Sequence, residues 1–223
     1  MRIKELNILT FNLNSQIDFY KGILGLNIIN RTENKVTFKI GNSLLTLKQD
    51  KNFKPYHIAI NIPCNMDFDA LKWLKERLNV LKFNNNEIQD FSYWNANAIY
   101  FYDADKNVME FITRRNLNNQ STENFSYKSL LEISEIGMPV DDIKSTYESI
   151  SKIVNIPIYD GGFDKFCAIG GEKGLFICIN KNKKRWFPTD DKAYSSDFEI
   201  DFQLNKDCYS LRFDNGKIYT NIK

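Results

Sequence analysis

Histidine is almost absent from this sequence. The chain of 223 residues contains a single histidine, His57, so a site that needs two imidazoles from one subunit is excluded. Charge of one sign is not in excess either, because 30 basic and 28 acidic residues leave a formal net charge of +2. That balance indicates neither a nucleic-acid-binding protein nor a protein of the membrane surface. The densest basic run, residues 181–185, is short and is typical of a solvated loop rather than a phosphate-binding patch.

Cysteine pairs and long apolar runs are also missing. The four cysteines stand at positions 64, 167, 178 and 208, and none belongs to a Cys-x-x-Cys pair, so zinc-ribbon and thioredoxin-like motifs are not indicated. No apolar run approaches the roughly 20 residues that cross a bilayer. Residues 1–6 are too polar for a signal peptide. We therefore expect a cytoplasmic protein with reduced thiols that binds neither a membrane nor nucleic acid.

The sequence does contain a repeated pattern of predicted elements, which is a strand, a helix and three further strands. Alternation of apolar residues predicts the strands, and the helix shows an apolar stripe that ends at a glycine, Gly25. In the first copy these elements fall at residues 3–11, 14–24, 26–31, 35–40 and 43–49.

The same order returns further along the chain. The second copy has its elements at residues 56–62, 67–78, 86–91, 97–102 and 107–114. A polar stretch at 116–126 is typical of a linker. The third copy has its elements at residues 130–140, 141–154, 156–159, 164–169 and 174–180. Residues 195–223 contain strand-like runs without a helix, which indicates a partial fourth copy.

These repeats predict the fold class. One copy leaves a face of its sheet uncovered, whereas two copies side by side can curl into an open cup with the helices outside. We therefore predict an α+β protein of repeated βαβββ modules with cup-shaped mixed sheets. Modules one and two are expected to form the first cup and a domain at residues 1–117. Module three and the partial module four are expected to form a second domain at residues 127–223.

Three runs in the first half of the chain resemble a known superfamily. They are Phe-Tyr followed by Leu-Gly-Leu within residues 19–26, Tyr-His-Ile-Ala-Ile at 56–60, and Tyr-Phe-Tyr-Asp-Ala-Asp-Lys-Asn-Val-Met-Glu-Phe at 100–111. In this order and spacing they resemble the vicinal oxygen chelate superfamily, which includes glyoxalase I, fosfomycin-resistance thiol transferases, extradiol dioxygenases and bleomycin-sequestering proteins. The third run is similar to its Phe-x-Asp-Pro-Asp-Gly-Asn-x-x-Glu segment, with Ala104 for Pro and Lys106 for Gly.

The resemblance implies a metal site. The ligand positions of the superfamily match Glu5, His57 and Glu110, and a fourth position falls at Thr46, which is a poor ligand. Such a set suits a divalent metal, with Mn, Fe, Ni and Zn as the candidates, and leaves positions open for substrate oxygens. The metal would act as a Lewis acid. Oxygen activation by iron expects two histidines and one carboxylate, and that set is incomplete here.

The strand pattern agrees with this implication in part. Period-two alternation places Glu5, His57 and Glu110 on the cup faces of their strands. Further residues face the cup or can stack on a ring-shaped ligand, so we take them as ligand-binding candidates. They are Asn7, Asn61, Tyr100 and Tyr102.

Other readings of the same residues stay open. Without a metal, Glu110 can hydrogen-bond to His57 and hold it as a general base, and Glu5 can pair with a neighbouring lysine. In the third module Glu135 occupies the first-ligand position, but residues 174–180 contain no carboxylate. We therefore take the third module as a structural partner or as the second wall of the pocket.

Three functions follow from these residues. The favoured one is a glyoxalase-like or dioxygenase-like protein, a metal-dependent lyase, isomerase or dioxygenase that acts on a small oxygen-bearing molecule through His57 and Glu110. The alternative is a metal-free protein that sequesters a small aromatic compound. The third is a catalytically inactive interaction module with a filled pocket. In each case we expect a monomer or a homodimer.

Overall fold

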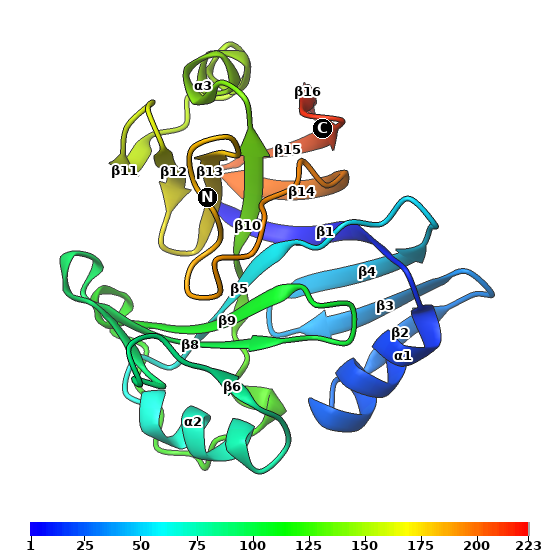
Figure 1. Cartoon of the computed structure of the whole chain (residues 1–223), viewed down its shortest axis with the longest axis vertical. Coiled ribbons are helices and arrows are strands. Elements are labelled where there is room, and N and C mark those ends of the chain that lie inside the picture. Colours follow the sequence, from blue (N-terminus) through cyan, green and yellow to red (C-terminus); the bar gives the residue numbers. More distant parts are fainter. Residues whose placement is uncertain (223) are drawn as a thin grey trace.

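The computed structural model describes residues 1–222, and two mixed β-sheets dominate it (Figure 1). The α+β class predicted from the sequence is confirmed. Module one comprises β1 (Arg2–Thr10), α1 (Leu13–Ile17), the π-helix η1 (Asp18–Ile23), β2 (Ile28–Arg31), β3 (Lys35–Ile40) and β4 (Ser43–Gln49).

Module three repeats this order, and module two repeats it with one additional short strand. Module two comprises β5 (His57–Ile62), α2 (Asp67–Lys75), β6 (Val80–Leu81), β7 (Gln89–Phe91), the short 3₁₀ turn η2 (Ser92–Trp94), β8 (Ala96–Tyr102) and β9 (Val108–Arg114). The link to module three contains the 3₁₀ turns η3 (Arg115–Leu117) and η4 (Tyr127–Ser129). Module three comprises β10 (Glu132–Val140), α3 (Ile143–Ser151), β11 (Ile158–Gly161), β12 (Phe166–Gly171) and β13 (Gly174–Asn180).

The end of the chain is the partial fourth module that the sequence predicts. It contains β14 (Phe198–Leu204), β15 (Asp207–Asp214) and β16 (Lys217–Ile222), and no helix occurs within residues 198–222. None of the helices in the described part of the chain is long and apolar enough to span a membrane.

Side-chain caps begin two of the three α-helices. Asn12 caps α1, because its backbone is extended and its side-chain oxygen accepts a hydrogen bond from the Ser15 N–H at 3.1 Å. Asp67 lies within the first turn of α2 and does not cap it. Asp142 caps α3, because its side-chain oxygen accepts a hydrogen bond from the Ser145 N–H at 3.0 Å.

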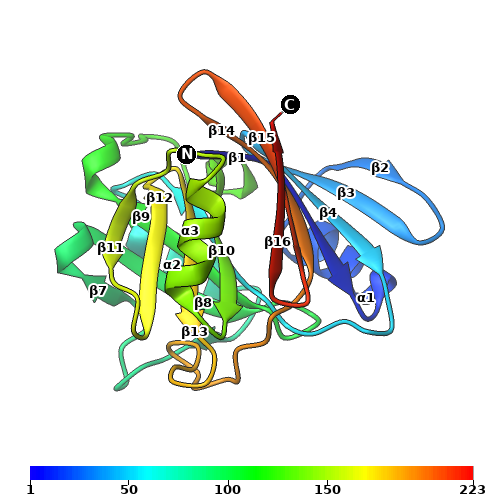
Figure 2. The ribbon, with the colours of Figure 1, turned by 90° about the horizontal axis from the view of Figure 1, so that it is seen from above.

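The pairing of the modules is not the expected one. One sheet has the strand order β16-β15-β14-β1-β4-β3-β2, so module one pairs with module four. The other has the order β11-β12-β13-β10-β5-β9-β8-β6, so module two pairs with module three. Our prediction that modules one and two form one cup is therefore wrong. Both sheets take strands from both halves of the chain, as Figure 2 shows for β14 and β15 beside β1. The division into domains at residues 1–117 and 127–223 stays a prediction about folding units, and the sheets do not follow it.

Burial explains this pairing physically. Every residue of β5 and of β10 is buried, so each of these strands needs a neighbour on both edges and cover on both faces. They pair with each other, antiparallel, at the centre of their sheet, with Ile58 opposite Ile136 and Ile60 opposite Ile133. On β1 one face stays half-exposed, at Glu5, Asn7 and Leu9.

The main core lies between the two sheets, on the faces directed away from the cups. Leu6 and Ile8 of β1 belong to the same apolar cluster as Ile58 and Ile60 of β5. This packing leaves the cup faces free for other uses.

Asp103, in the turn between β8 and β9, ties this turn to the first helical segment. Its carboxylate accepts hydrogen bonds from Gln16 Nε2 (2.9 Å), the Tyr20 hydroxyl (3.0 Å) and Asn107 Nδ2 (2.7 Å). Replacing Asp103 by Ala leaves these buried donors without an acceptor, so we expect the free energy of unfolding to fall by about 3 kcal/mol. Urea denaturation measures the loss. Asp69→Ala, on the exposed face of α2, is the control, and an equal loss in both variants would contradict the prediction.

Candidate metal centre and its pocket

Three ionisable side chains meet on the cup face of the central strands β5, β9 and β10. The parallel register of β9 puts Glu110 opposite Ala59 of β5, and the antiparallel register of β10 puts Glu135 opposite the same alanine from the other side. Residues two apart on a strand share a face, so His57, at the start of β5, lies beside both carboxylates. The small side chain of Ala59 leaves space between them.

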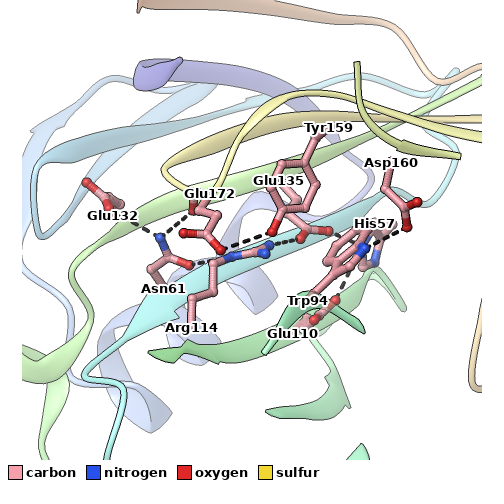
Figure 3. A network of polar contacts seen from close by, with 10 residues as sticks. All are labelled: His57, Asn61, Trp94, Glu110, Arg114, Glu132, Glu135, Tyr159, Asp160 and Glu172. Atoms are coloured by element: carbon pink, nitrogen blue, oxygen red, sulfur yellow. Dashed lines mark hydrogen bonds and ion pairs between the residues drawn. The ribbon is translucent and has the colours of Figure 1, made fainter. Parts of the chain in front are cut away.

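The distances define one compact cluster (Figure 3). Nε2 of His57 lies 3.5 Å from Oε2 of Glu110 and 3.5 Å from Oε2 of Glu135. One ligand atom from each of the three residues lies within 4.8 Å of the others. The exposed fractions are 5% for His57 and 3% for each glutamate, so the cluster is almost completely removed from bulk water.

Burial and mutual charge govern the electrostatics of the cluster. Burial, with the nearby carboxylate of Glu135, raises the pKa of Glu110 to about 8. Burial lowers the pKa of His57, but hydrogen bonding to Glu135 and the charges of both carboxylates outweigh it, so this pKa lies above its usual value. Burial and the same carboxylates hold the pKa of Tyr100 well above its usual range, so its hydroxyl stays protonated and hydrogen-bonds to Glu110.

The cluster fits a divalent metal ion. An imidazole nitrogen and two carboxylate oxygens are donors that Mn, Fe, Ni and Zn accept. Burial is the larger cause of the raised pKa of Glu110, and repulsion between the two neighbouring carboxylates raises it further. A cation between them would remove this repulsion, because the opposite charge favours both ionised forms.

Glu5 does not join this cluster, although the sequence placed it there. It lies on β1 in the other sheet, where the Thr46 hydroxyl donates a hydrogen bond to its Oε1 at 3.5 Å. The reason is the sheet pairing, since the neighbour of β5 is β10 and not β1. Glu135, which the sequence placed at the equivalent position of module three, stands where Glu5 was expected. Ile177 of β13 matches the position of Glu110 in module three, so the fourth position of this cup is apolar.

Of the four predicted ligand-binding residues, Tyr100 lines the pocket beside the cluster. Tyr102 points to a neighbouring cavity, where its hydroxyl donates a hydrogen bond to Asp191. Asn61 is fully buried and donates to the Glu172 carbonyl at 2.9 Å. Asn7 lies on β1 of the other sheet.

The pocket above the cluster has a volume of about 430 Å³ and a predominantly aromatic wall. Its wall combines strands of modules two and three with the loop between β13 and β14. The aromatic residues of the wall are Phe91, Tyr93, Trp94, Tyr100, Phe166, Trp186 and Phe187. Lys184 is the only cationic side chain among its described lining residues, apart from His57 if it is protonated.

Trp186 is a pocket residue that our sequence analysis missed. It comes from an irregular loop, and its ring centroid lies 4.9 Å from that of His57. A methyl group at Gly137 would come within 2.6 Å of the Trp186 ring, so this ring position requires glycine there. A tryptophan beside a basic loop run was the only signal for it. Such a loop has no periodicity that could place the ring against the cluster.

Replacing Gly137 by Ala tests this contact. The added methyl group must displace the Trp186 ring, so we expect a loss of about 2 kcal/mol in stability and a shifted tryptophan fluorescence spectrum. Gly162→Ala is the matched control, because nothing lies within 4 Å of the atom that it adds. Adding Trp186→Phe should recover part of the loss, and a Gly137→Ala protein as stable as the control would refute the predicted clash.

Paired βαβββ modules with a buried His-Glu-Glu cluster on the cup face define the architectural class of this protein. No protein-family model matches the chain. The chain is 33% identical over 122 residues to the metallothiol transferase FosB of Staphylococcus haemolyticus. The matched region covers 50% of this chain and 84% of that protein. The FosB of Staphylococcus epidermidis is likewise 33% identical over 122 residues, with the same coverage. The chain belongs to the vicinal oxygen chelate superfamily.

Solved structures agree on the fold over the full chain. A candidate dioxygenase from Bacillus subtilis superposes with a TM-score of 0.65 at 12% identity and covers 100% of this chain and 84% of that one. A point variant of glyoxalase I from Zea mays superposes with a TM-score of 0.58 at 12% identity, over 99% of this chain and 92% of that one. These two structures therefore share the fold of this protein over both halves of the chain.

Proposed function

We propose that this protein is a metal-dependent enzyme that acts on a small oxygen-bearing molecule, with His57, Glu110 and Glu135 as the ligands of a divalent cation. The observation that carries the proposal is the buried cluster of these three side chains, whose ligand atoms lie within 4.8 Å of one another. The metallothiol transferases to which the chain is similar support metal dependence, and they favour transfer of a group such as a thiol. Lyase, isomerase and dioxygenase reactions are the other forms that this superfamily suggests.

The bound ion would supply Lewis acidity towards an oxygen of the substrate. With the cation bound, Glu110 is held ionised, so its carboxylate can accept and return a proton beside the substrate. Tyr100 holds this carboxyl by a hydrogen bond. The aromatic wall around Trp186 excludes water from one side of the cluster, which strengthens these interactions.

Metal content measured by mass spectrometry, on protein purified without a metal-affinity tag, tests the proposal. We expect near-stoichiometric Mn, Fe, Ni or Zn in the wild type and its loss in His57→Ala and Glu135→Gln. Glu5→Gln is the matched control and should keep its metal, because Glu5 lies in the other sheet. A wild-type protein that holds none of these ions, even after incubation with each, would refute the proposal.

A metal-free sequestering protein for a small aromatic compound is the second candidate. The predominantly aromatic pocket wall favours it, since rings stack on such side chains. It predicts that an aromatic ligand binds equally well to the wild type and to His57→Ala. The metal-dependent proposal predicts that binding of an oxygen-bearing ligand requires the ion and is lost in that variant.

A further inference from the structure

Arg114 is the largest fully buried side chain in the described part of the protein, and it lies next to the cluster. It ends β9, and alternation along this strand puts it on the same cup face as Glu110. An arginine charge cannot be removed at physiological pH, so burying it is costly unless it is paired. The ion-pair partner of Arg114 therefore indicates which group this buried charge stabilises.

The guanidinium group of Arg114 joins the cluster to a second polar group (Figure 3). Its Nη2 donates a hydrogen bond to Oε1 of Glu135, and its Nε donates to Oδ1 of Asn61 at 3.2 Å. Asn61 is itself fixed, because its Nδ2 donates to the carbonyl oxygen of Glu172 at 2.9 Å and to Oε1 of Glu132 at 3.2 Å. The guanidinium is thus held at two points and cannot turn away from Glu135.

This contact divides the two oxygens of Glu135 between different partners. Oε1 is taken by Arg114, whereas Oε2 faces Nε2 of His57 at 3.5 Å. Glu135 therefore offers one oxygen to the centre of the cluster. Glu110 has no arginine of this kind among its described ion pairs, so the two carboxylates are not equivalent.

Arg114 also changes the net charge of the site. With His57 neutral and both carboxylates ionised, the cluster carries two negative charges, and Arg114 offsets one of them. A divalent ion then leaves one net positive charge instead of none. Such a charge in a buried site favours the anionic form of a bound oxygen, which is the form that a polarised substrate develops.

We propose that Arg114 is a positioning residue that holds Glu135 as a one-oxygen ligand and keeps the metal-loaded site positively charged. The inference rests on the proposed metal dependence and adds a residue that the ligand set alone does not include. Residues that orient a metal ligand by a hydrogen bond, without binding the metal themselves, typically lower metal affinity by about 10- to 100-fold when they are replaced.

The experiment measures the dissociation constant for Mn²⁺ on the full chain, by the electron paramagnetic resonance signal of the free ion. We expect Arg114→Met to bind Mn²⁺ about 10- to 100-fold more weakly than the wild type. Adding Arg114→Met to Glu135→Gln should cause no further loss, because Arg114 acts through Glu135. Arg115→Met is the matched control, since Arg115 is exposed and its ion pair is with Asp67.

Two results would overturn the inference alone. One is a wild type that binds Mn²⁺ together with an Arg114→Met variant that binds equally well. The other is a double variant whose loss is the product of the two single losses, which indicates an effect independent of Glu135. A wild type that binds no ion removes the proposed function and this inference together, so the two failures can be told apart.

A second variant and a second signal cover the case in which Arg114→Met does not fold. Arg114→Lys keeps the charge but cannot bridge Glu135 and Asn61, so we expect about tenfold weaker binding, and unchanged binding counts against the inference. In either Arg114 variant both oxygens of Glu135 are free to bind the metal, so a bound Co²⁺ ion should gain one ligand. The higher coordination number should weaken its absorption of visible light. An unchanged Co²⁺ spectrum would mean that Arg114 does not orient Glu135.

Discussion

Replacing Glu110 by Gln should make the metal-free protein more stable at pH 8 while it reduces Mn²⁺ affinity by at least about 1000-fold. In the folded protein the pKa of Glu110 is about 8 and lies above the usual value of 4.5, because this carboxyl is buried beside Glu135. The native state therefore keeps a proton that the unfolded state has lost, and the free energy of unfolding falls as pH rises from about 4.5 to 8. Gln has the same shape and does not titrate, so the variant avoids this loss.

The whole shift corresponds to about 5 kcal/mol at 1.36 kcal/mol per pKa unit, and the surroundings reorganise around the charge. We therefore expect Glu110→Gln to gain about 2–3 kcal/mol over the wild type at pH 8 and almost nothing at pH 5. Urea denaturation of chelator-treated protein at both pH values measures this, and Mn²⁺ should then stabilise only the wild type. Glu5→Gln is the control without either effect. A variant less stable than the wild type at pH 8 would contradict the prediction.

The sequence predicted the parts of this fold that local patterns determine. The alternation at residues 56–62 places His57 on the cup face, and the motif that ends in Glu110 places that carboxylate on the last strand of the same module. The number and order of strands in modules one and three follow from the same alternation, whereas in module two the single strand expected at 86–91 is replaced by the two short strands β6 and β7. These signals depend on neighbours along the chain, so they are visible in the sequence.

Module pairing was not visible in this way, and the error on Glu5 follows from it. The choice between β1 and β10 as the neighbour of β5 depends on contacts between residues far apart in the chain. Residues 132–140 contain two glutamates, a serine and a proline among their apolar residues, so their composition does not indicate a central strand. Only the assembled sheet shows that this strand is buried along its whole length and pairs with β5. Trp186 and Arg114 were missed for the same reason, since their partners lie on other modules or strands.

Metal affinity should fall about 100-fold when the pH is lowered from 8 to 6. A ligand must lose its proton before it binds a cation, so binding releases protons and depends on pH. Because the pKa of Glu110 is about 8, each unit below this pH costs about a factor of ten while one proton has to leave. The pKa of His57 is also raised above 6.5, which makes the dependence steeper at the acidic end.

Mn²⁺ titrations at pH 6, 7 and 8 measure this slope, and calorimetry in buffers of different ionisation enthalpy counts the protons released. Tyr100→Phe provides a directional test, because the Tyr100 hydrogen bond lowers the pKa of Glu110. Without that bond the carboxyl holds its proton more firmly, so the affinity curve should move to higher pH. A curve that is flat between pH 6 and 8, or that moves to lower pH in Tyr100→Phe, would show that Glu110 does not exchange a proton for the ion.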